Sequence, residues 1–179
     1  MKQLLFVLLL LAPAIGCSGG TADDTAVDSA TDSDGVAADP QAALILPERF
    51  WSSGTPEKAR DVLDLRDEDL VGQTVAVRGT VKEFVDGFAA FVLVEDTLQS
   101  CDEIPGDSCP TPWDYCCVDL AELARGTAFV EFQESGRPGP WTIEGFHGIA
   151  QLSEVVVTGT LEIDDADNMS LVATSIRLQ

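Results

Sequence analysis

Five segments of this chain have the residue pattern of β-strands, and this limits the fold most. They alternate apolar and polar residues, except that residues 88–95 are apolar on both parities and are expected to be more buried. In the first segment, residues 73–81, Val75, Val77 and Val81 share one parity while polar residues occupy the other. Successive side chains of a strand point to opposite faces, so the alternation predicts one buried face and one solvated face. Further strands are predicted at residues 88–95, 126–133, 154–163 and 170–178. The sequence therefore predicts a mainly β domain.

Two predicted strands carry a glycine at equivalent places, Gly79 within residues 75–81 and Gly159 within residues 155–161. A glycine inside a strand marks a bulge or a sharp bend, which lets one strand serve two sides of a barrel. Between the third and fourth strands, the apolar residues of 144–153 recur with the spacing of a short helix. The predicted order for residues 70–179 is β-β-β-α-β-β.

This order resembles the OB-fold, a five-stranded Greek-key barrel with one short helix between strands three and four. The resemblance rests on residues 75–81, 91–96, 155–161 and 171–176. It implies a single small barrel with an open face of the kind that binds nucleic acid or oligosaccharide. A different small barrel is the alternative, and the fold alone does not assign a function.

Residues 1–17 have the layout of a bacterial export signal, with Lys2 followed by an apolar run and small residues. The apolar stretch is shorter than the roughly 18 residues that a membrane-spanning helix needs. Residues 14–17 resemble a lipobox, which implies cleavage before Cys17 and its modification with diacylglycerol and palmitate. Ser18 implies sorting to the outer membrane, facing the periplasm or the cell surface. Cleavage after Ala14, releasing a soluble protein, is the alternative.

Between the signal and the barrel, composition predicts two further parts. Residues 18–43 consist mainly of small residues and aspartate, which cannot bury enough surface to fold, so we predict a disordered acidic tether. Residues 44–69 are predicted to form a short helical or irregular segment. There, Thr55 and Pro56 are typical of a helix start, so we expect one or two helical turns ending near Leu65.

The formal net charge of -21, from 31 acidic and 10 basic residues, argues against nucleic acid as a partner. Acidic groups at residues 28–34 and 164–168 resemble calcium loops only superficially, and we interpret them as tether and hairpin turn. No cofactor is expected. The expected contacts are the membrane, through the lipid, and an envelope protein or glycan.

The predicted insertion at residues 97–119 contains four cysteines, Cys101, Cys109, Cys116 and Cys117. The run from Cys109 to Cys117, CPTPWDYCC, resembles one found in exported bacterial lipoproteins and implies no activity. Outside the cytoplasm, two disulfides are the first expectation. A bond between the neighbours Cys116 and Cys117 is strained, which leaves Cys101 with Cys116 and Cys109 with Cys117, or the crossed pairing. Tetrahedral metal binding and thiol redox chemistry are the alternatives.

No catalytic constellation is recognisable, because His147 is the only histidine and no serine occupies a nucleophile elbow. A lone histidine of this kind is typical of polar surface rather than of a metal ligand or proton carrier. The sequence therefore predicts a non-catalytic binding or scaffold module of the cell envelope. A metal-binding or redox protein that uses the four cysteines is the alternative.

Overall fold

The computed structural model describes residues 44–54 and 58–179. The predicted export signal with Cys17, the predicted acidic tether and the predicted helix start at Thr55 and Pro56 lie outside these ranges. Within them, no helix has both the length and the apolar character that crossing a bilayer requires.

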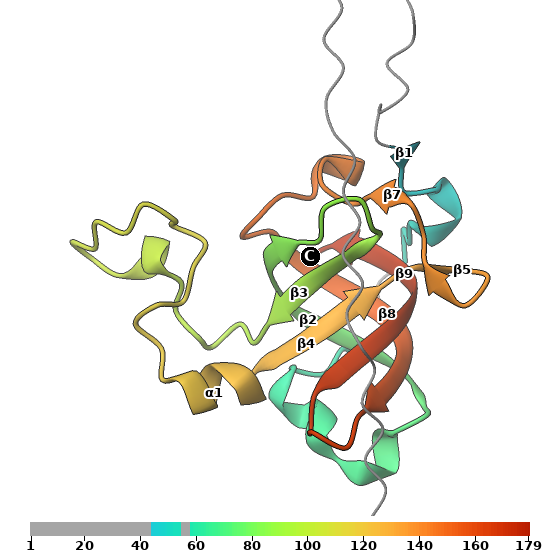
Figure 1. Cartoon of the computed structure of the whole chain (residues 1–179), viewed down its shortest axis with the longest axis horizontal. Helices are drawn as coiled ribbons and strands as arrows, with labels where there is room; N and C mark the ends of the chain where they lie inside the picture. Colours follow the sequence, from blue (N-terminus) through green and yellow to red (C-terminus); the bar gives the residue numbers. More distant parts are fainter. Residues whose placement is uncertain (1–43, 55–57) are drawn as a thin grey trace, which may run out of the picture. The chain divides into compact units, whose positions relative to one another are not determined.

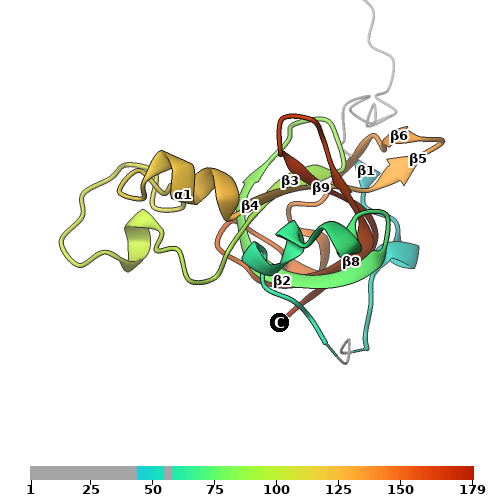
Figure 2. The same cartoon turned by 90° about the horizontal axis from the view of Figure 1, so that it is seen from below.

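Five strands close into a barrel with the order β2-β3-β4-β9-β8 (Figures 1 and 2). They are β2 (Thr74–Phe84), β3 (Ala90–Val94), β4 (Thr127–Glu131), β8 (Glu154–Ile163) and β9 (Met169–Leu178). Each lies where the sequence predicted a strand. The parallel pair β4–β9 closes the ring between antiparallel neighbours. This is the OB-like barrel that the resemblance implied.

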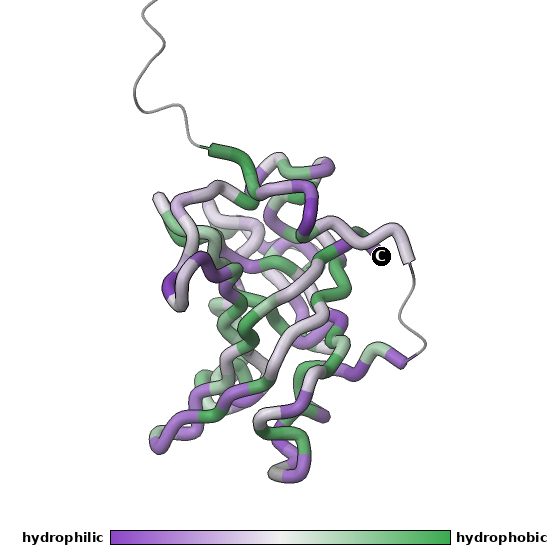
Figure 3. Tube along the Cα trace, turned by 90° about the vertical axis from the view of Figure 1, so that its right-hand side faces the viewer, coloured by the Kyte–Doolittle hydropathy of each residue, from purple (hydrophilic) through white to green (hydrophobic). Residues whose placement is uncertain are grey.

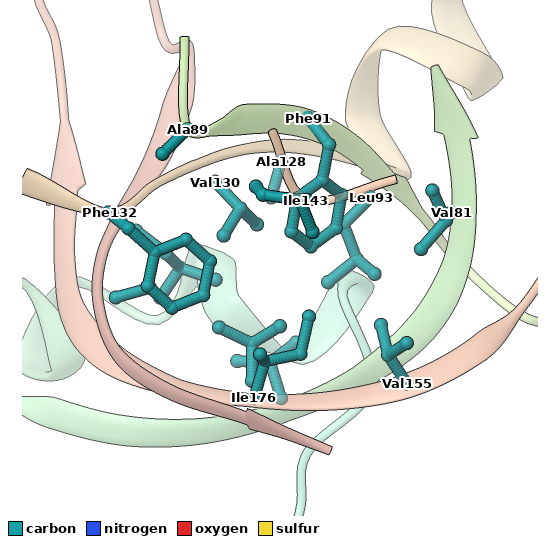
Figure 4. Packing of buried hydrophobic residues seen from close by; sticks show 14 of the residues in the cluster. Val81, Ala89, Phe91, Leu93, Ala128, Val130, Phe132, Ile143, Val155 and Ile176 are labelled. Atoms are coloured by element: carbon teal, nitrogen blue, oxygen red, sulfur yellow. The ribbon is translucent and has the colours of Figure 1, made fainter. Parts of the chain in front are cut away.

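The inward parity is also as predicted. Val77 and Val81 of β2 and Ala128 and Val130 of β4 are all 0% exposed and belong to one core cluster. Figure 3 shows hydrophobic and hydrophilic residues interspersed along the chain trace, and Figure 4 shows the side chains of Val81, Ala128 and Val130 inside the ring. Each fully buried aliphatic or aromatic side chain of this kind contributes about 1.5–3 kcal/mol. The barrel interior is therefore a filled core and not a binding cavity.

Gly79 and Gly159 allow the strands to approach closely. A Cβ on Gly79 would lie 2.6 Å from the Val94 carbonyl oxygen, and one on Gly159 would lie 2.6 Å from that of Val172. The register between β8 and β9 shifts beside Gly159, as a bulge requires. The bulge on β2 lies instead between Val81 and Glu83.

The helix predicted between the third and fourth strands is wrong in extent. That connection holds β5 (Gln133–Glu134), β6 (Arg137–Pro138), β7 (Trp141–Thr142) and the 3-10 turn η5 (Phe146–Gly148). His147 has a φ of 48°, in the left-handed region, so the turn cannot extend into an α-helix. The α-helix lies instead between β3 and β4, as α1 (Leu120–Arg125). It begins at Asp119, whose side chain accepts the amides of Ala121 and Glu122.

The segment before the barrel is part of the same core. It comprises β1 (Leu44–Ile45) and the 3-10 turns η1 (Glu48–Phe50), η2 (Leu63–Arg66) and η3 (Glu68–Leu70). The helical turns predicted from residue 58 onward are absent up to residue 62. There the backbone of Arg60 bonds to Ala76 and Arg78 along the edge of β2 that β3 leaves unpaired. Pairing that edge satisfies its amides, and a helix would not do so.

Candidate functional site in the cysteine loop and on the adjoining barrel face

The cysteine loop, residues 97–119, connects β3 to β4 and extends to one side of the barrel (Figures 1 and 2). Its two arms are held together by backbone hydrogen bonds. The amide of Cys101 donates to the Asp114 carbonyl at 2.8 Å, and the amide of Asp102 donates to the Pro112 carbonyl at 2.9 Å. This pairing of the arms brings Cys101 next to Cys116.

The root of the loop is fastened to the barrel by a small second core. Tyr115, 2% exposed, and Leu98 pack against Val94 of β3, and Val92, Val118 and Leu123 surround them. Asp114 also pairs with Lys82 of β2, with 3.5 Å between Oδ1 and Nζ. The loop therefore has a packed base and a part that projects away from the barrel.

Three of the four sulfurs converge in the projecting part. The Sγ atoms of Cys101, Cys109 and Cys116 all lie within 4.8 Å of one another. Those of Cys101 and Cys116 are 3.1 Å apart, longer than a disulfide bond. A second group joins Cys116 to Cys117 and to a carboxylate oxygen of Asp107, again within 4.8 Å. Asp107 is a member of the cluster that the sequence analysis missed.

The thiols of the cluster differ in acidity. Hydrogen bonds with the hydroxyl and the backbone of Thr111 lower the pKa of Cys109. The hydrogen bond with Cys116, followed by burial, raises the pKa of Cys101 to about 12. The hydrogen bond to Cys101 lowers the pKa of Cys116. Burial and the hydrogen bonds to Cys109 and Cys117 outweigh this effect, so the pKa of Cys116 is raised. One thiol with a lowered pKa thus lies beside two thiols with raised pKa values.

An apolar groove of about 450 Å³ lies beside the base of the loop, and we call it the α1–β4 groove. Its lining consists of Leu120, Leu123, Ala124, Thr127, Phe129, Asn168 and Met169. Leu120 is 81% exposed and Phe129 is 37% exposed, so two large apolar side chains face solvent here. The groove lies over the outer face of β4 and reaches the turn that joins β8 to β9. The groove was not predicted from the sequence, in which its only signal is the capping residue Asp119 ahead of Leu120 and Leu123.

A polar hollow of about 210 Å³ lies on the other side of the loop base. Its lining includes Thr80, Asp96, Ser100, Glu103 and Glu154. Burial raises the pKa of Asp96, although the Thr80 hydroxyl partly offsets it. Glu103 accepts hydrogen bonds from the amide and hydroxyl of Ser100, so its carboxylate already has partners.

His147 makes structural contacts with the segment that precedes the barrel. Its ring stacks on Trp51 at 3.9 Å between centroids, and its Nε2 lies 2.9 Å from a carboxylate oxygen of Glu48. The prediction of plain polar surface was therefore too simple. The histidine joins η5 to the segment that precedes the barrel, and among the described residues it belongs to neither sulfur group.

The turn at residues 164–168 is a hairpin connection, as predicted. Asp164 accepts hydrogen bonds from the amides of Ala166 and Asn168 and from the Asn168 side chain. Its carboxylate closes the turn between β8 and β9.

No protein-family model matches the chain, and no match is found among curated proteins. Among solved structures, OBody AM1L10 bound to hen egg-white lysozyme is similar, with 16% identity and a TM-score of 0.41 over 71% of this chain and 98% of that one. An aspartyl tRNA synthetase from Entamoeba histolytica has 14% identity and a TM-score of 0.42, over 75% of this chain and 26% of the synthetase. This chain thus spans about a quarter of the synthetase. Likeness at such identity concerns the fold alone, and these TM-scores add nothing to the topology described above.

Proposed function

We propose that this chain is a lipid-anchored, extracytoplasmic binding module of the bacterial cell envelope, which holds a protein partner in the α1–β4 groove. The observation that carries the proposal is the exposed apolar lining of that groove, with Leu120 81% exposed. The proposed role is non-catalytic.

The position of the groove supports a binding role. OB-folds bind their ligands on the face of strands two and three and with the loop between strands four and five. The corresponding elements here are β3, β4 and the turn between β8 and β9. The base of the cysteine loop covers Val92 and Val94 on β3, which leaves Phe129 on β4 and Asn168 in the turn at the groove.

The chemistry of the groove favours a protein partner over a glycan. Leucine, methionine and phenylalanine side chains dominate the lining, and Thr127 and Asn168 are its polar members. An aliphatic or aromatic side chain of a partner would cover this surface, whereas a sugar would leave most of its hydroxyls without hydrogen bonds. The net charge of -21 disfavours a nucleic acid.

Replacement of Leu120 by glutamate tests the groove. Leu120 is the first residue of α1, where an acidic side chain suits the helix dipole, so Leu120→Glu leaves the fold intact. Val71→Glu is the matched control, because Val71 is 43% exposed and lies outside the groove lining. The assay is crosslinking of the full chain in envelope fractions, identification of the partner, and affinity measurement with the purified partner.

Loss of one leucine contact weakens binding by roughly 10- to 100-fold. We expect this loss for Leu120→Glu and none for Val71→Glu. A partner that binds both variants equally would place the interface elsewhere. An envelope oligosaccharide that binds the wild type and not Leu120→Glu would contradict the choice of a protein.

The anchor is tested separately through Cys17. Several acyl chains give firm attachment, since each buried methylene contributes about 0.8 kcal/mol. We expect radiolabelled palmitate to appear on the wild-type chain, and we expect Cys17→Ser to carry none and to be released into the soluble fraction. Unlabelled wild-type protein, or membrane attachment of Cys17→Ser equal to the wild type, would refute the lipid anchor.

A further inference from the structure

We infer that the tip of the cysteine loop is a zinc site in which Cys101, Cys109 and Cys116 supply three thiolates and the pair Asp107 and Cys117 supplies the fourth ligand. This inference does not depend on the α1–β4 groove, because no residue of the sulfur groups lines it. It concerns the same four cysteines for which the sequence predicted disulfides.

The arrangement of the sulfurs favours a metal over two disulfides. Two disulfides need two separate pairs, but here Cys109 lies within 4.8 Å of both Cys101 and Cys116. Cys117, its partner in one pairing scheme, is grouped with Cys116 and Asp107 instead. Ligand atoms that converge around a common point are what a metal ion requires.

The geometry suits a tetrahedral ion after a small adjustment. With zinc–sulfur bonds of about 2.3 Å, tetrahedral thiolates lie about 3.8 Å apart. The Sγ atoms of Cys101 and Cys116 are 3.1 Å apart and would have to separate by about 0.7 Å. Rotation about the Cys116 side chain can provide this, because Cys116 is exposed. Thus the three sulfurs need no rearrangement of the paired arms of the loop. The fourth ligand, Asp107 or Cys117, is grouped with Cys116 alone of the three and has to move toward the other two.

The donor set identifies the metal. Thiolates bind both zinc and Cu(I), but a carboxylate in the cluster is compatible with zinc and unfavourable for Cu(I). Asp107 is held in place because its Oδ1 accepts the amide of Cys109 at 3.1 Å. The acidic surface of the chain further attracts a dication.

The loop is built to hold such a site. The hydrogen bonds of Cys101 to Asp114 and of Asp102 to Pro112 tie the two arms together, and Tyr115 fixes the arm that carries Cys116. Two of the ligands, Cys101 and Cys116, therefore come from arms whose spacing is set before any ion binds. Pre-organisation of this kind lowers the entropy that binding has to overcome.

The experiment isolates the full chain from the bacterial envelope without added reductant, then counts free thiols and measures bound metal. We expect one equivalent of zinc, with the three thiols of Cys101, Cys109 and Cys116 reacting only after chelation. The thiol of Cys117 is protected as well if it supplies the fourth ligand in place of Asp107. Substituted Co(II) should show thiolate-to-metal charge-transfer bands and the absorption of a tetrahedral ion. A metal-free protein with no reactive thiols would overturn the inference in favour of two disulfides.

Variants separate this site from general attraction to the acidic surface. Cys109→Ser should weaken zinc binding at least about 100-fold, the upper end of what changes to outer-shell partners cost. Asp107→Asn should also weaken zinc binding. Its matched control is Asp102→Asn, which changes an exposed acid of the same loop outside both groups and should leave zinc binding unchanged. Zinc binding that Cys109→Ser leaves unchanged, or that Asp102→Asn weakens as much as Cys109→Ser does, would refute the site. Far-UV circular dichroism checks that each variant keeps the barrel, whose core lies apart from the loop tip.

Discussion

Replacement of Tyr115 by alanine should release the cysteine loop while leaving the barrel folded. Tyr115 is 2% exposed and belongs to the small core at the loop root, which is separate from the core inside the barrel. The side chain therefore stabilises the docked loop against local opening. Its removal should increase opening of the loop more than unfolding of the barrel.

The magnitude follows from the area that the ring buries. A tyrosine buries about 150–250 Å², which at about 25 cal/mol per Å² corresponds to roughly 4–6 kcal/mol. Truncation of buried aromatics to alanine costs about 3–5 kcal/mol. The phenol is partly polar and the loop root can close over part of the space, so we expect about 3 kcal/mol for loop opening.

Native-state hydrogen exchange measures this opening directly. The amides of Cys101 and Asp102 donate across the two arms of the loop and report its closure. A change of about 3 kcal/mol corresponds to exchange that is on the order of 100-fold faster at these amides. Amides in β8 and β9 should change much less. Tyr115→Phe is the control, because it keeps the ring.

Two results would refute this reasoning. Unchanged protection of Cys101 and Asp102 in Tyr115→Ala would show that the loop does not depend on this anchor. Equal loss of protection in the loop and in β8 and β9 would show that loop and barrel unfold as one cooperative unit, contrary to the separation of the two cores.

Three further predictions concern the barrel. Gly159→Ala should lower the free energy of unfolding, measured in urea, by about 1–3 kcal/mol, because the new Cβ would lie 2.6 Å from the carbonyl oxygen of Val172. An unchanged free energy would mean that β9 can shift away from Gly159 without cost. Phe132→Ala should cost about 3–5 kcal/mol by thermal unfolding, since the ring is 0% exposed, and a loss below about 1 kcal/mol would contradict its place in the core. The bond from the Asn168 side chain, followed by those from backbone amides, lowers the pKa of Asp164, so its stabilisation is present above the ordinary pKa near 4 and is lost as the pH falls through the lowered value. Urea unfolding of Asp164→Ala should therefore show a deficit at neutral pH that disappears in strong acid, and a deficit of the same size at every pH would be inconsistent with this role.

The strands could be predicted because each carries its own signal. Alternation is a local property, and the inward parity of Val77, Val81 and Val130 follows directly from it. The hairpin turn at 164–168 was equally readable, since aspartate and asparagine close turns with their own side chains.

The helical predictions were less successful for a physical reason. The apolar spacing of residues 144–153 fits a helix, yet Phe146 and Ile149 are buried from a 3-10 turn, because the same spacing also serves a bent chain that packs on a core. Near Arg60 the backbone satisfies an unpaired strand edge instead of forming a helix. Which edge is left unpaired depends on the whole barrel and has no local signature.

The candidate site, too, was predictable from the sequence in part only. Residue types were enough to select Cys101, Cys109, Cys116 and Cys117 as candidate site residues. The location outside the cytoplasm, inferred from residues 1–17, stays a prediction. The convergence of the cysteines with Asp107, and the meeting of Leu120 with Phe129 and Met169 in the α1–β4 groove, required the folded chain. Distances between sulfurs and the exposure of an apolar face depend on how the loop arms pair and how α1 packs against β4. The backbone hydrogen bonds between the loop arms set the first, and the pairing of β4 with β9, which brings the distant Met169 beside β4, sets the second.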